Sequence, residues 1–150
     1  MKRTRTRLLR GTRVTELTGL HGNTLKRLVE EGFLLRSPNT LNYSGLELVV
    51  ARLLKELETR ATKATAERDR LAVAVLRDAL IRGEVRPSTD LVLSLETATL
   101  AHTFGERIDA TQHLRDHHVF GVGVWLATYK DREPEAFEES MLIAAAAVAA

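Results

Sequence analysis

A glycine that interrupts an apolar pattern near the N-terminus constrains this fold most. The stretch from Val14 to Leu35 reads VTELTGLHGNTLKRLVEEGFLL, and leucines recur at helical spacing on both sides of Gly19. Glycine ends helices readily because it adopts the left-handed conformation without strain. Leu20 follows at once and can fill the turn with an apolar side chain. The pattern therefore predicts two short helices, about 13–18 and 22–31, capped near Thr12 and His21 and joined as a helix–turn–helix.

The second predicted helix has two chemically different faces. Leu25, Leu28 and Val29 would face the first helix, whereas the opposite side carries polar and charged residues. Asparagine pairs well with adenine and lysine or arginine with guanine, while threonine suits a phosphate or a thymine methyl group. We therefore expect the outward face to enter the major groove of DNA through Asn23, Thr24, Lys26 and Arg27.

Positive charge is concentrated at the N-terminal end. Residues 1–60 carry 12 Lys and Arg against 6 Asp and Glu, and residues 61–150 carry 10 against 14, which leaves the chain at +2. A basic end on an acidic remainder indicates a polyanionic partner, although a solvated terminus would look the same. The residues expected to contact the DNA backbone or the minor groove are Arg3, Arg5, Arg7, Arg10 and Arg13, with Arg36 beyond the second helix.

The rest of the chain predicts helices and a few strands. A short hairpin is expected over 33–36 and 41–43, followed by a capping box in which Ser44 caps and Glu47 reaches back. Two helices over about 45–60 and 65–82 follow, either separate or fused into one rod. The segment 83–90, GEVRPSTD, is the best domain boundary. Beyond it we expect a strand at 91–95, a helix at about 97–117, a strand at 119–129 and a last helix from Pro134. Parallel strands there would form a β-α-β unit with a right-handed crossover.

The predicted fold class is therefore mainly α with a small β component. Residues 1–60 would form a winged helix–turn–helix with a basic N-terminal arm. Residues 61–83 would form a helical linker, and residues 84–150 a small α/β domain for oligomerisation or regulation.

The motif also resembles a known family. VTELTGLHGNTLKRLVEEGFLL followed by NYSGLEL is similar to the winged helix–turn–helix of the MerR-type regulators and the related excisionases, over about residues 12–57. In that resemblance Thr24, Leu25 and Lys26 belong to the second helix and Tyr43-Ser44 opens the helix after the wing. The match departs where Arg27-Leu28 replaces an aromatic pair and where Asn42 replaces a basic residue. The metal-binding cysteines of the family have no counterpart, because the chain contains no cysteine.

Two other features suggest different chemistry. Five residues would fall on one face of the helix expected at 97–117 and could hold zinc, although a solvated face explains them more simply: His102, Glu106, Asp109, His113 and His117. The C-terminal stretch MLIAAAAVAA is expected to pack as a helix end or a dimer contact. Alternatively, its small apolar residues resemble a bacterial degradation tag, as in some temperate-phage repressors.

These observations favour a DNA-binding regulator, and first of all a repressor that occludes a promoter, with a phage immunity repressor as one form of it. The alternatives are an architectural protein of excisionase or partition type and, third, a metal-dependent enzyme in the C-terminal part. We expect no catalytic site, cofactor or metal. The expected partners are double-stranded DNA, a second copy in a homodimer and a bacterial protease that acts on the tail. No apolar run is long enough for a membrane helix, and the expected setting is the cytoplasm of a bacterium or an infected bacterial cell.

Overall fold

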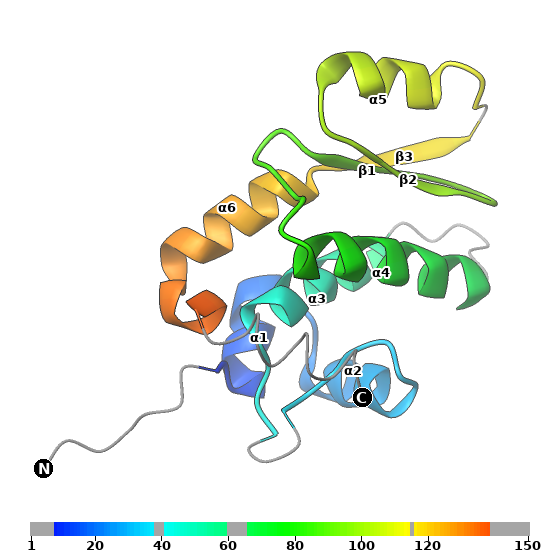
Figure 1. Ribbon diagram of the computed structural model, residues 1–150. Helices are drawn as coiled ribbons and strands as arrows, with labels where there is room; N and C mark the ends of the chain where they lie inside the picture. The colour runs from blue at the N-terminus through cyan, green and yellow to red at the C-terminus, as the bar shows by residue number, and fades with distance from the viewer. Residues whose placement is uncertain (1–7, 38–40, 60–65, 115, 139–150) are drawn as a thin grey trace, which may run out of the picture.

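The computed structural model describes residues 8–37, 41–59, 66–114 and 116–138. These residues form mainly helices and one three-stranded antiparallel sheet (Figure 1), so the predicted class, mainly α with a small β component, is confirmed. Within these residues no helix is both long enough and apolar enough to cross a membrane.

The two N-terminal helices and the glycine turn lie where the sequence predicts them. α1 spans Gly11–Thr18 and α2 spans Gly22–Glu30. The prediction that Thr12 caps α1 is wrong, because Arg10 occupies the cap position and the helix begins at Gly11, two residues earlier than predicted. The described part of the expected hairpin holds no strand at 33–36. Tyr43 instead forms an antiparallel bridge with Leu9, which ties the chain before α1 to the chain before the third helix.

The third and fourth helices form an antiparallel pair. α3 spans Gly45–Thr59 and α4 spans Ala66–Ile81, close to the predicted bounds. Arg77, late in α4, bonds to Glu47 in the first turn of α3, so the two helices run side by side and not as one rod. Leu71 of α4 is 41% exposed.

The sheet has the order β2-β1-β3, with β1 at Asp90–Ser94, β2 at Ala98–Ala101 and β3 at His117–Phe120. Both pairings are antiparallel, so the predicted β-α-β crossover is wrong. In Figure 1 the sheet lies between α4 on one side and α5, Phe104–Thr111, on the other. The helix expected at 97–117 is therefore a strand followed by a shorter helix.

The strand expected at 119–129 is mostly a helix. After β3, α6 spans Val122–Arg132 with Gly121 at its cap. Val122, Leu126 and Tyr129 are buried, and their spacing of four and three residues is helical. The alternating Val and Gly residues of GVGVW imitate a strand over so short a distance. Residues 134–138 are helical, as predicted from Pro134.

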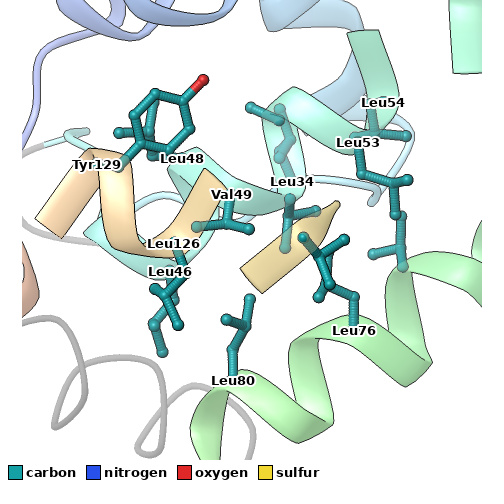
Figure 2. Packing of buried hydrophobic residues seen from close by; sticks show 14 of the residues in the cluster. Leu34, Leu46, Leu48, Val49, Leu53, Leu54, Leu76, Leu80, Leu126 and Tyr129 are labelled. Carbon is teal, nitrogen blue, oxygen red and sulfur yellow. The ribbon is translucent and has the colours of Figure 1, made fainter. Parts of the chain in front are cut away.

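Apolar residues from both sides of the predicted domain boundary share one hydrophobic core. The cluster includes Leu20, Leu25 and Leu28 of the N-terminal helices as well as Leu91, Phe120 and Leu126 from beyond residue 84. Figure 2 shows Leu76 and Leu80 of α4 and Leu126 of α6 gathered around the leucines and Val49 of α3. α4 thus contributes to the core through Leu76, Ala79 and Leu80, which are nearly inaccessible to solvent.

Candidate nucleic-acid interface

The turn between α1 and α2 is held by a left-handed glycine and a threonine side chain. Gly19 has φ of 85°, and its N–H donates to the carbonyl of Thr15 at 2.9 Å. The Thr18 hydroxyl donates to the carbonyl of Val14 at 2.7 Å and accepts the N–H of Leu20 at 3.2 Å. Leu20 is 1% exposed, so it fills the space under the turn as predicted. These contacts set the direction in which α2 leaves the turn.

α2 presents a polar face to solvent over a buried apolar one. Leu25 and Leu28 are buried, Asn23, Lys26 and Arg27 are exposed, and Thr24 is half-buried. The structure therefore leaves three of the four residues predicted for the major groove exposed to solvent. Glu30 and Glu31 lie at the C-terminal end of the helix, and Glu31 lines the same hollow as Arg27.

The N-terminus of α2 is also positive for a backbone reason. His21 occupies the cap position without a side-chain hydrogen bond to the first turn, and that turn carries no acidic residue. Uncapped amide groups and the aligned peptide dipoles make such an end favourable for an anion. The exposed polar face of α2 is thus most electropositive toward Asn23 and Lys26.

A hollow of about 420 Å³ lies between the first turns of α1 and α2 and beside Tyr43. Gly11, Thr12 and Thr15 of α1 line one side of it, and Lys26 and Arg36 supply two positive charges. Sequence reasoning named Lys26 and Arg36 but not the α1 residues. The sequence feature that could have identified Gly11, Thr12 and Thr15 is their spacing, which places them on one face of α1.

Arg36, one of the predicted backbone contacts, lines the hollow together with Tyr43. Burial raises the pKa of the Tyr43 hydroxyl, and the neighbouring Arg36 guanidinium partly offsets this rise through its charge and a hydrogen bond. Arg36 is exposed, whereas Tyr43 is 3% exposed. A guanidinium carries five N–H donors, so the Arg36 side chain beside Tyr43 has donors to offer a ligand in the hollow.

Arg27 lies toward a second hollow of about 300 Å³ on the other side of α2. Glu31, Glu58 and Asp69 share that lining with Arg27. The carboxylates offset its charge more than they offset that of Lys26, which lines the first hollow together with Arg36. Among the predicted base-reading cations, Lys26 therefore lies in the more positive environment.

The predicted backbone contacts lie in different places. Arg10 is exposed at the N-cap of α1. Arg13 donates to Glu16 and to Glu133, which follows α6, and these hydrogen bonds, Glu133 first, raise the pKa of its guanidinium. Its charge is therefore largely compensated within the protein. Arg3, Arg5 and Arg7 lie outside the described residues.

The five residues considered for zinc do not share a helix face, so the expectation that they lie together on one helix is wrong. α5 ends at Thr111 and includes only Glu106 and Asp109 of the five. The Glu106 carboxylate accepts the N–H groups of His102 and Thr103 in a capping box, and the His102 ring bonds to the Thr89 hydroxyl at 2.8 Å. Among the described ranges, no group of three or more His, Asp or Glu side chains is placed to hold a metal ion.

Comparison with known proteins adds no family to this description. No protein-family model matches the chain, and no curated protein matches it. The resemblance to MerR-type regulators and excisionases therefore stays a prediction that depends on the motif between residues 12 and 57.

Proposed function

We propose that this protein is a sequence-specific DNA-binding regulator and that α2 is its recognition helix. One observation carries the proposal: the polar face of α2, with Asn23, Lys26 and Arg27, lies in solvent on a helix whose opposite face is anchored in the core. A helix of this kind fits the major groove, and its N-terminal residues meet base edges.

The hollow beside α2 supports a backbone contact next to the base-reading residues. Lys26 and Arg36 line it together with the first turn of α1. Two cations beside a helix N-terminus favour a phosphate group. Phosphate contacts set register and affinity, whereas base contacts set sequence choice. In this arrangement Arg36 would strengthen binding to every duplex, whereas Asn23 would strengthen binding to the preferred sequence only.

The proposal extends to regulation by occlusion. A protein that covers a promoter represses it without any chemical step, which suits a site built from amides and cations. We place this activity in a bacterial cytoplasm, with a temperate-phage immunity repressor as the specific form.

The C-terminal segment proposed as a degradation signal lies outside the described residues. If it is such a signal, deletion of residues 144–150 should lengthen the half-life of the protein in cells.

The deciding experiment selects duplexes from a random pool and then measures variants on the selected site and on an unrelated duplex. Asn23→Ala and Arg27→Ala should each lose about 1–3 kcal/mol of discrimination between the two duplexes. Arg36→Ala should weaken both duplexes alike and reduce the dependence of affinity on salt. Arg86→Ala, which changes an exposed arginine between α4 and β1, is the matched control and should leave discrimination unchanged.

Two results would overturn or redirect the proposal. If the wild-type protein binds no duplex at low ionic strength, it is not a DNA-binding protein of this kind. If it does bind, footprinting distinguishes a regulator from an architectural protein, because a repressor protects a discrete site whereas an excisionase-like or partition protein covers tandem sites.

A further inference from the structure

A buried ion pair joins α3 and α4 directly beneath the segment that leaves α2. Glu47 is 3% exposed, and its two carboxylate oxygens accept from Arg77 at 2.8 Å and 2.6 Å. This is a two-point contact between a planar guanidinium and a carboxylate, which fixes orientation as well as distance. The capping-box prediction is half right here: Ser44 accepts the N–H of Glu47 at 3.2 Å, but the Glu47 side chain turns toward Arg77.

The same two side chains also hold the backbone of the segment after α2. One Glu47 oxygen accepts the N–H of Leu35 at 2.9 Å, and Arg77 donates to the carbonyl of Phe33 at 2.8 Å. The ion pair therefore grips the backbone on both sides of Leu34, which is itself 1% exposed. The next residue along the chain is Arg36.

A second arginine of α4 reinforces the grip. Arg70 donates to the carbonyl of Glu31 at 2.9 Å, and its guanidinium lies 4.4 Å from the centre of the Phe33 ring. α4 thus contacts the chain at three points between the end of α2 and Arg36. Other residues of α4, among them Leu76 and Leu80, enter the apolar core.

We infer that Glu47 and Arg77 are positioning residues, which fix the backbone at Phe33–Leu35 and so hold Arg36 in the hollow beside Lys26. This inference rests on the proposed function and adds α4 to the DNA-binding unit. Glu47 is buried and Arg77 is half-buried, and in this inference neither contacts DNA; they act through Arg36. Tyr43 lines the same hollow as Arg36.

The direction in which Glu47→Gln changes DNA affinity distinguishes a positioning role from an effect of net charge alone. Glu47→Gln makes the protein more positive, and long-range attraction to DNA alone would then strengthen binding. Loss of the backbone grip has the opposite effect, because Arg36 must be ordered at the moment of binding. We expect Glu47→Gln to weaken binding by about fivefold and to lower the salt dependence, as loss of one phosphate contact does.

A double-mutant cycle with Arg36→Ala tests whether the effect passes through that side chain. If it does, Glu47→Gln costs about fivefold in the wild-type background and almost nothing once Arg36 is absent. Circular dichroism at the assay temperature establishes that each variant is folded. Arg77→Lys keeps the charge but cannot reach both Glu47 and Phe33, and it serves as the second variant if Glu47→Gln does not fold.

Asp78→Asn is the matched control, because it changes an exposed carboxylate one residue from Arg77 on the same helix. It should leave DNA affinity unchanged or slightly raised. Full additivity of Glu47→Gln or Arg77→Lys with Arg36→Ala would overturn the inference while DNA binding stands. Failure of the wild-type protein to bind any duplex would instead overturn the proposed function itself.

Discussion

At the scale of single residues, glycine decides where two backbones can meet. A Cβ atom on Gly123 would lie 2.0 Å from the Arg86 carbonyl oxygen and 2.8 Å from that of Pro87. The Gly123 N–H donates to the Thr89 carbonyl at 2.9 Å, so the first turn of α6 lies directly on the loop that precedes β1. Glycine at this position permits the contact, and the same glycine made the segment resemble a strand.

Gly123→Ala should therefore destabilise the protein. The added methyl group meets backbone atoms that cannot rotate away, and we expect a loss of about 1–3 kcal/mol in the free energy of unfolding. Urea denaturation followed by circular dichroism measures it. Gly105→Ala is the control. Gly105 lies in α5, and the nearest atom to a Cβ built there would be 3.9 Å away, so this change should be neutral or stabilising. Equal stability of the two variants would contradict the close approach.

Through the carboxyl group of Asp69, the stability of the folded protein should depend on pH. Burial raises the pKa of its carboxyl above the ordinary value of 3.8, and the nearby Arg68 only partly opposes this rise. The folded state then binds a proton more readily than the unfolded chain, so Asp69 costs stability as pH rises through its folded pKa. Asp69→Asn should raise the melting temperature at pH 7, and the gain should shrink as pH falls toward 4. A gain that grows on acidification would show the opposite pKa shift.

At the scale of elements, α5 differs most from its expected packing. At helical spacing Phe104 and Ile108 would share one face of the helix expected at 97–117, and apolar residues on one face of a helix usually pack inward. In the structure α5 is eight residues long and buries none of them fully, with Phe104 67% and Ile108 47% exposed. A helix this short covers the outer side of the sheet with only part of its surface. Apolar spacing along the chain therefore identified a helix but not the side that it packs on.

Phe104→Ser consequently has a small expected effect on stability. Most of the ring already contacts solvent and the rest lies against the Arg107 guanidinium, so the change should stay within about 0.5 kcal/mol. Phe120→Ala, at a ring only 2% exposed, should cost about 3–5 kcal/mol. Thermal unfolding of both variants under one condition makes the comparison. A large loss for Phe104→Ser would return α5 to the packing expected from the sequence.

At the scale of the whole molecule, the N-terminal helices and the C-terminal part are joined by polar contacts as well as by the core. The Tyr129 hydroxyl donates to the Leu17 carbonyl at 3.2 Å, and Glu133 pairs with Arg13, so the end of α6 holds α1. The Phe137 ring lies directly against Gly45 at the start of α3, where a Cβ would meet it at 2.6 Å. The proposed DNA-binding surface is therefore supported from residues far along the chain.

A fragment of residues 1–83 should consequently fold poorly. It would expose the sides of α3 that Leu126 and Tyr129 cover, and it would lack the contacts to α1. We expect a broad, weakly cooperative thermal transition and at least a tenfold loss of DNA affinity, because only the folded fraction binds. A sharp transition with affinity equal to that of the full chain would show that the N-terminal part is an independent domain.

The sequence by itself determined the local features whose physics is local. Gly19, Leu20 and the leucines of α2 predicted two helices and their turn, because a left-handed glycine and helical spacing act over a few residues. Asn23, Lys26 and Arg27 were found exposed for the same reason. Only the tertiary structure decided the antiparallel sheet, the short α5, the helical α6, and the grip of Glu47 and Arg77 on the segment before Arg36. Each of these depends on contacts between residues that are distant in the chain, such as Gly123 with Arg86 or Arg77 with Phe33, and no pattern within a single segment encodes them.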